Sequence, residues 1–154
     1  MQMKIGALVN NLGSSQLSYY IINNFNKVAG KGKVDPIVYC ENVEKDCLFA
    51  KFPTMQLAEA WGQEGTMIAT SLSTAKNLVS YPSPQKRLYY VWDLEWLRMP
   101  YDYNPLLELF SSDSIEIITR CENHARVVEN TFNRKVNFIV DNFNIEQILD
   151  ICKD

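Results

Sequence analysis

The sequence has no long apolar run, no excess of positive charge and no leader-like N-terminus. A helix that crosses a membrane needs about 18 or more apolar residues in a row, so none is expected here. The opening residues, MQMKIGALVNN, lack the apolar segment and small-residue cleavage site of a signal peptide. The 15 basic and 18 acidic residues give a net charge of −3, which argues against a nucleic-acid partner. We therefore expect a cytoplasmic protein.

Histidine and cysteine are both scarce, and the four cysteines are scattered. Cys121 and His124 have the spacing of a metal-binding pair, but a closed zinc site needs two further ligands. Cys40 and Cys47 are too far apart in sequence to supply them in the usual pattern. No order of residues resembling Ser-His-Asp or Cys-His catalysis stands out. We expect reduced cysteines, no metal and no cofactor, and His124 in a capping or surface role unless it reaches the site.

Glycine is scarce where a nucleotide-binding protein needs it. The first apolar segment leads into the turn Asn10–Ser15, which contains a single glycine, Gly13. A dinucleotide-binding GxGxxG loop or a P-loop needs more than one, so neither is predicted. The turn still precedes a helix, whose first N–H groups attract an anion or a sugar hydroxyl. An ordinary strand-to-helix turn is the alternative.

Strand-like and helix-like apolar patterns alternate along the whole chain. Strands are predicted at residues 3–9, 34–40, 55–60, 66–70, 87–92, 115–119 and 136–140, and helices at 17–28, 71–79, 106–110, 122–132 and 145–152, with a loop or short helix over 41–53. No hairpin signal such as Asn-Gly is present. The pattern predicts an α/β fold, with one three-layer Rossmann-like domain over residues 1–154. Its mostly parallel sheet of six or seven strands carries helices on both faces.

Capping residues stand at the predicted helix starts. Ser14 or Ser15 can begin the first helix, and Ser71 or Ser73 the second. Asn104 followed by Pro105 favours a helix start because proline suits the first turn. Asn144 is followed at the third helical position by Gln147, which predicts a capping box.

The stretch Lys86–Met99 holds the most distinctive chemistry in the chain. A strand ending at Trp92 is followed directly by Asp93, Glu95 and Trp96. Ligands of parallel sheets bind outside the carboxyl ends of the strands, so this turn and those at Asn10–Ser15 and Ser71–Thr74 are the candidate site. Asp93 is the candidate general base or ligand of a hydroxyl group, and the two tryptophans are candidates to stack on a sugar or base. Capping by Asp93 and by the hydroxyls near Ser71, and core packing by the tryptophans, are the alternatives.

Three segments resemble the N-terminal domain of GT-B fold glycosyltransferases. They are KIGALVNNLGSSQLSYYIINNFNKV at the start, RLYYVWDLEW in the middle and IEIITRCENHARVVENTFNRKVNFIVDNFNIEQIL at the end. Trp92 stands where this family commonly has histidine, Cys121 where it has serine, and Phe143 where its last motif has glycine. The resemblance implies an acceptor-side domain, whereas the nucleotide sugar is bound mainly by a second domain.

Two functional hypotheses follow from the resemblance and its departures. In the first, the chain is the acceptor-side half of a glycosyltransferase-like enzyme, working with a second GT-B-like domain in another chain or in a homo-oligomer. It transfers a sugar from a nucleotide-sugar donor to an acceptor. Asp93 is its catalytic residue, and substrate is bound by Asn11, Gly13, Ser14, Ser15, Ser71, Trp92, Glu95 and Trp96. In the second, the fold serves as a non-catalytic binding or assembly module, and surface aromatic residues such as Trp96 or Tyr101 carry its interactions. A nucleotide-binding α/β protein of another kind is a third, weaker option.

Overall fold

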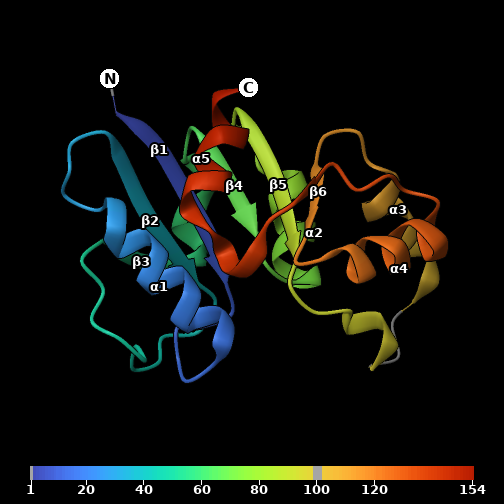
Figure 1. Cartoon of the computed structure of the whole chain (residues 1–154), viewed down its shortest axis with the longest axis horizontal. Helices are drawn as coiled ribbons and strands as arrows, with labels where there is room; N and C mark the ends of the chain where they lie inside the picture. The colour runs from blue at the N-terminus through green and yellow to red at the C-terminus, as the bar shows by residue number, and fades with distance from the viewer. Residues whose placement is uncertain (1, 99–101) are drawn as a thin grey trace.

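The protein is built around one parallel sheet (Figure 1). The structure is a computed structural model that describes residues 2–98 and 102–154. Seven strands lie in the order β3-β2-β1-β4-β5-β6-β7, and every neighbouring pair is parallel. The strands are β1 (Met3–Val9), β2 (Val34–Cys40), β3 (Thr54–Gln56), β4 (Thr66–Ala69), β5 (Lys86–Val91), β6 (Glu116–Thr119) and β7 (Phe138–Ile139). The predicted parallel α/β sheet is confirmed.

Helices cover both faces of the sheet, as predicted. Helices α1 (Gln16–Val28) and α5 (Ile145–Lys153) pack on one face, against the side chains of Ile5, Ala7 and Val9. Helices α2 (Leu72–Ser80), α3 (Tyr103–Ser111) and α4 (Glu122–Phe132) pack on the other face with Leu8. Successive strand residues point to opposite faces, and so each strand contributes to both cores. None of the helices in the described part of the chain is long and apolar enough to cross a membrane.

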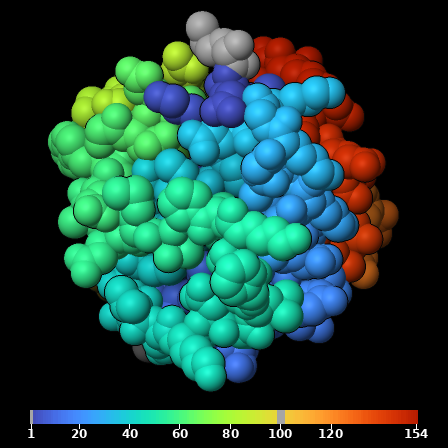
Figure 2. All heavy atoms as spheres, turned by 90° about the vertical axis from the view of Figure 1, so that its left-hand side faces the viewer, coloured from blue at the N-terminus to red at the C-terminus, as the bar shows by residue number. Residues whose placement is uncertain are grey.

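The chain between β2 and β4 differs from the prediction. A strand was expected over 55–60, but β3 ends at Gln56 and a 3₁₀ turn, η1 (Leu57–Gly62), follows. The Gln56 N–H donates to Glu59 Oε2 at 3.1 Å, a capping interaction that turns the chain away from the sheet. The expected loop over 41–53 is present, and Asn26 of α1 holds it through the Phe49 carbonyl and the Lys51 N–H, each at 2.8 Å. The chain between β2 and β4 covers much of the side of the molecule at the β3 edge of the sheet (Figure 2).

Two of the predicted helix starts also differ in detail. Helix α3 begins at Tyr103 with Asp102 before it, so Asn104 lies inside the first turn instead of capping it. Asn144 does cap α5, accepting from the Gln147 N–H at 3.1 Å. The Gln147 side chain accepts from the Asp141 N–H at 3.2 Å, so the second half of the predicted capping box is wrong. The Asn144 N–H donates to the Asp141 carbonyl instead, through the turn η3 (Asp141–Phe143).

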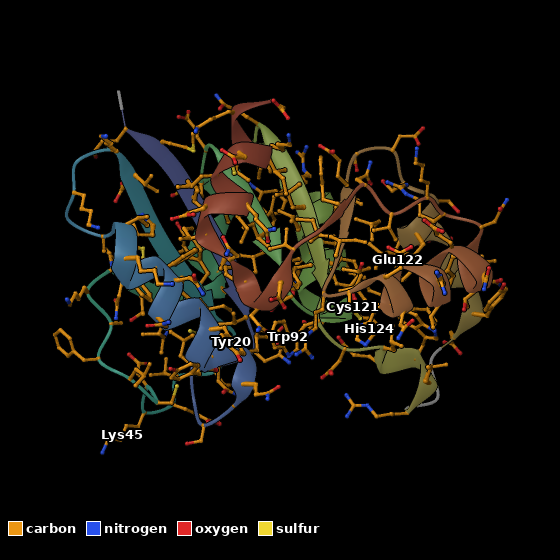
Figure 3. The ribbon with its side chains drawn as sticks, viewed as in Figure 1. Tyr20, Lys45, Trp92, Cys121, Glu122 and His124 are labelled. Atoms are coloured by element: carbon orange, nitrogen blue, oxygen red, sulfur yellow. The ribbon has the colours of Figure 1, made fainter. Side chains whose placement is uncertain are left out.

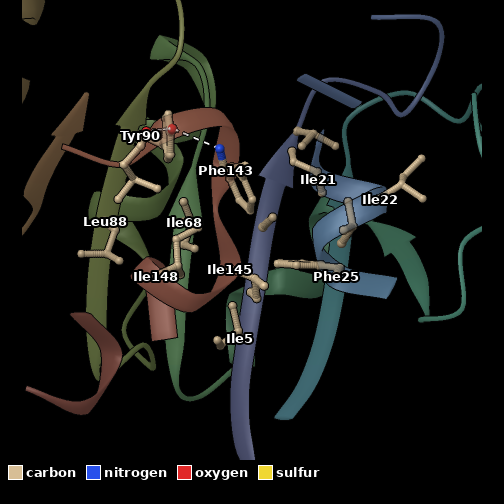
Figure 4. Packing of buried hydrophobic residues seen from close by; sticks show 14 of the residues in the cluster. Ile5, Ile21, Ile22, Phe25, Ile68, Leu88, Tyr90, Phe143, Ile145 and Ile148 are labelled. Atoms are coloured by element: carbon tan, nitrogen blue, oxygen red, sulfur yellow. Dashed lines mark hydrogen bonds between the residues drawn. The ribbon is translucent and has the colours of Figure 1, made fainter. Parts of the chain in front are cut away.

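Buried polar groups hold this η3 turn against the sheet. The Tyr90 hydroxyl of β5 donates to the Val140 carbonyl and accepts from the Phe143 N–H at 3.3 Å (Figure 4). Asn24 of α1 donates to the Asn142 carbonyl and accepts from the Ile145 N–H, both at 3.3 Å. Asn142 and Phe143 have φ values of +47° and +57°, a conformation that glycine adopts most easily. The buried hydrogen bonds offset the cost of this backbone.

Candidate functional site

The order of the strands reverses between β1 and β4, and a cavity lies at that point. β1 pairs with β2 on one side and with β4 on the other, so the turns after β1 and β4 diverge to opposite faces. A cavity of about 290 Å³ opens there. The residues lining it come from the turns after β1, β4 and β5: Asn10, Asn11, Ser15, Leu17, Thr70, Ser71, Trp92, Asp93, Glu95 and Arg98. We call this cavity the crevice.

The turn after β1 is held by its own side chains. Asn11 Oδ1 accepts from the Gly13 N–H at 2.9 Å, and Ser15 Oγ caps α1 by accepting from the Ser18 N–H at 3.1 Å. Asn11 and Ser15 line the crevice, whereas the predicted site residues Gly13 and Ser14 are not among its described lining residues. A Cβ on Gly13 would lie 2.6 Å from a carboxylate oxygen of Glu44, so the glycine lets that side chain approach the turn.

The turn after β4 is bonded directly to the turn after β1. Thr70 Oγ1 donates to the Leu8 carbonyl at 2.7 Å, and Ser71 Oγ donates to Asn10 Oδ1 at 3.2 Å. Ser71 is also the N-cap of α2, accepting from the Thr74 N–H at 3.2 Å. The hydroxyl of Ser71 is therefore both a cap and part of the crevice wall, which combines the two interpretations of this turn.

Trp92 forms a wall of the crevice but has little ring surface to offer. Only 6% of the residue is exposed. The Arg120 guanidinium lies 3.7 Å from the centre of the indole, and the Tyr20 ring centre is 5.9 Å from it. Tyr20 and Trp92 lie side by side at the lower edge in Figure 3. The cation–π contact and the neighbouring ring occupy surface on which a sugar would have to stack.

The acids after β5 both have partners. Asp93 Oδ2 accepts from Arg98 Nη2 at 3.0 Å, in an ion pair that is more than half exposed. Glu95, in the turn η2 (Glu95–Leu97), accepts from the Leu72 N–H at 3.1 Å, at the start of α2. Asp93 and Glu95 therefore line one crevice together with Arg98.

Trp96 lies away from the crevice. Its ring centre is 5.4 Å from that of Phe110 and 5.0 Å from that of Phe132, so the indole packs between α3 and α4. Its Nε1 atom is buried without a hydrogen-bond partner. These contacts are those of a core residue, the alternative interpretation of the tryptophans. Met99 and Tyr101 lie outside the described residues.

Two basic residues near the crevice were not singled out from the sequence. Arg98 and Arg120 reach the site because the turns after β5 and β6 lie beside one another, a placement that sequence spacing does not reveal. His124 lies in the first turn of α4, where the charges of Arg120 and Asp93 act on the pKa of its imidazole in opposite directions. Burial, and then the charge of Arg120, lower the pKa of its imidazole, so it is neutral at pH 7.

The cysteines and acids do not gather into a metal site in the part of the chain that the structure describes. All four cysteines are unpaired. Cys40, the last residue of β2, is buried, and burial raises the pKa of its thiol to about 11. Cys121 is exposed at the start of α4.

In comparisons with protein-family models, with curated proteins and with solved structures, nothing matched this chain.

Proposed function

We propose that this chain is the acceptor-side half of a glycosyltransferase-like protein. It holds a sugar-bearing acceptor in the crevice, and a second GT-B-like domain, in another chain or a second copy, supplies the nucleotide-sugar donor. One observation carries the proposal: six residues expected at the site, from three separate turns, line a single cavity at the point where the strand order reverses. Ligands of open parallel sheets bind at this point.

The crevice has the chemistry and the size for a sugar. Asn10, Asn11 and Ser71 present amide and hydroxyl groups, which can both donate to and accept from sugar hydroxyls. A cavity of about 290 Å³ is at the small end of ligand pockets and suits one sugar unit better than a whole nucleotide sugar. This size supports binding of the acceptor sugar in the crevice and of the nucleotide-sugar donor elsewhere.

In this proposal Asp93 accepts the proton of the acceptor hydroxyl. To do so it uses its second carboxylate oxygen, or exchanges Arg98 for the acceptor hydroxyl. The half-exposed ion pair makes that exchange inexpensive, because such pairs contribute about 0–1 kcal/mol. His124 cannot replace Asp93 directly, since its unpartnered Nδ1 atom is buried.

A non-catalytic binding module is the second candidate. The Asp93–Arg98 ion pair favours it, because the carboxylate already has a cationic partner. Trp92 favours it too, since it stands where the resembled family commonly has histidine and its ring is largely covered. Both candidates share a crevice that binds a sugar, and they differ in whether Asp93 is needed for chemistry.

Titration of the full chain with simple sugars tests the shared part, with backbone amide NMR as the readout. We expect neutral sugars to shift the amides of residues 10–15, 70–72 and 93–95. Asp93→Asn should weaken this binding, whereas Asp113→Asn, an exposed aspartate on the α3–β6 turn, makes the same change of charge and should not. The proposal is wrong if no sugar shifts these amides.

Complementation separates the two candidates. In cells that lack the native gene, Asp93→Asn should abolish function if the chain takes part in transfer. Full function with Asp93→Asn, together with retained sugar binding, would establish the non-catalytic module. Transfer by the isolated chain at the rate of a complete enzyme would show that no second domain is needed.

A further inference from the structure

The N-terminus of α2 faces the crevice, and most of the N–H groups around it already donate to acceptors within the chain. Such a terminus ordinarily attracts a phosphate because it presents unpaired N–H groups and a partial positive charge. Here the Thr70 and Ser71 N–H groups donate to Thr74 Oγ1 at 3.2 and 3.0 Å, and the Thr74 N–H donates to Ser71 Oγ. The Leu72 N–H donates to Glu95 Oε1 at 3.1 Å. A carboxylate of the chain itself occupies the position of a bound anion.

The charges around this position are unfavourable for a second anion. Among the described residues that line the crevice, Asp93 and Glu95 are acids and Arg98, which is paired with Asp93, is a base. Arg120 lies behind the lining, over the ring of Trp92. A further acid, Glu41, accepts from Ser73 Oγ at 3.0 Å on the first turn of α2. Like charges a few ångströms apart repel one another, so a phosphate at the start of α2 would meet the carboxylates of Glu95 and Glu41.

The backbone that carries Glu95 is anchored by packing. Trp96, the next residue, inserts its indole between Phe110 of α3 and Phe132 of α4. The chain forms the η2 turn there, with the Arg98 N–H donating to the Glu95 carbonyl. This gives Trp96 a role that the sequence did not suggest: it fixes the turn from which Glu95 reaches α2.

We propose that Glu95 is a specificity-determining residue that stands in for a phosphate and makes the crevice select uncharged polyhydroxyl ligands against phosphate-bearing ones. The identity of the ligand as a sugar rests on the proposed function, whereas the exclusion of phosphate rests on the hydrogen bond that Glu95 accepts at the start of α2. The crevice then belongs to the acceptor sugar, and the diphosphate of a donor is kept out of it.

The test uses inorganic phosphate as the probe and two substitutions of Glu95. Glu95→Gln keeps an oxygen for the Leu72 N–H but removes the charge, and Glu95→Ala removes both. The amides of residues 70–74 report phosphate at the start of α2. We expect no phosphate binding by the native chain at millimolar concentrations, binding by Glu95→Ala at least about tenfold tighter, and an intermediate result for Glu95→Gln.

Glu108→Gln is the matched control, because it makes the same change of charge on an exposed position of α3 and should behave as the native chain. Thermal unfolding establishes that each variant is folded, and Glu95→Gln keeps the test usable if Glu95→Ala is not. The proposal is wrong if the native chain binds phosphate at these amides as tightly as the variants, or if folded variants gain none. Failure of neutral sugars to bind the native chain counts against the proposed function, whereas the phosphate results still decide the role of Glu95.

Discussion

The two faces of the sheet are stabilised in different ways. On the α1–α5 face, the polar groups of Asn24 and Tyr90 are buried and bonded to the backbone of residues 140–145. On the α2–α3–α4 face, Phe110 and Phe132 stack with ring centres 4.1 Å apart, and buried polar atoms of Trp96 and His124 have no hydrogen-bond partner. The α1–α5 face thus has polar anchors for an irregular turn, whereas α3 and α4 on the other face are joined by the packing of aromatic rings.

The largest effect is expected from the aromatic stack. Phe110 is 1% exposed and contacts Tyr89, Trp96 and Phe132. Phe110→Ala should lower the free energy of unfolding by about 3–5 kcal/mol, because it removes buried ring surface and leaves a cavity. Urea unfolding followed by circular dichroism measures this loss. A loss below about 1 kcal/mol would show that this face does not depend on the stack.

The polar anchor on the opposite face should have the next largest effect. Asn24→Ala leaves the Ile145 N–H and the Asn142 carbonyl without this partner. A buried donor or acceptor that loses its hydrogen bond lowers the free energy of unfolding by about 1–3 kcal/mol. The same unfolding measurement applies, with Asn23→Ala on the same helix as the control for helix propensity. If Asn24→Ala and Asn23→Ala had equal free energies of unfolding, the hydrogen bonds of Asn24 would not anchor this face, and the contrast between the two faces would be wrong.

The left-handed backbone of η3 gives a smaller, sharper test. Alanine at position 142, where φ is +47°, should cost about 1 kcal/mol, since a β-carbon is crowded in this conformation. Asn142→Gly should be neutral or stabilising, because glycine adopts the conformation freely. The carbonyl that Asn24 binds is unchanged in both variants, so their difference isolates the backbone. A less stable glycine variant would contradict the assigned conformation.

The smallest effect is a pH dependence from His124 on the α4 side. Because the pKa of its imidazole is lowered in the folded protein, the unfolded chain binds the proton more readily. Its contribution to stability is complete above about pH 6.5 and is lost as the pH falls further. The imidazole is only partly buried, and Asp93 opposes the shift while Arg120 adds to it, so the loss is small. Thermal unfolding from pH 5 to 8 should show a shallower slope for His124→Gln than for the native chain.

The sequence predicted the sheet well because its signals are local. Apolar runs such as Met3–Val9, and caps such as Ser15 and Ser71, are read within a few residues. The crevice was also foreseeable, since parallel strands bring their carboxyl ends to one edge. The contacts within the crevice could not be predicted from the sequence. They are the Arg98–Asp93 ion pair, the bond from the Leu72 N–H to Glu95 and the Arg120–Trp92 contact, and they depend on how turns from different strands pack together.

The crevice lies across the boundary between two halves of the sheet. β1 and β4, which flank it, are joined by Ile5 opposite Thr66 and by the Thr70–Leu8 hydrogen bond, although they are distant in sequence. The β1–β2–β3 half and the β4–β7 half must therefore associate before the site exists. If a ligand binds the crevice as proposed, it binds only the joined state and raises the free energy of unfolding as its concentration rises above its dissociation constant. A thermal-shift screen of sugars therefore tests the proposed ligand class through the stability of the whole fold.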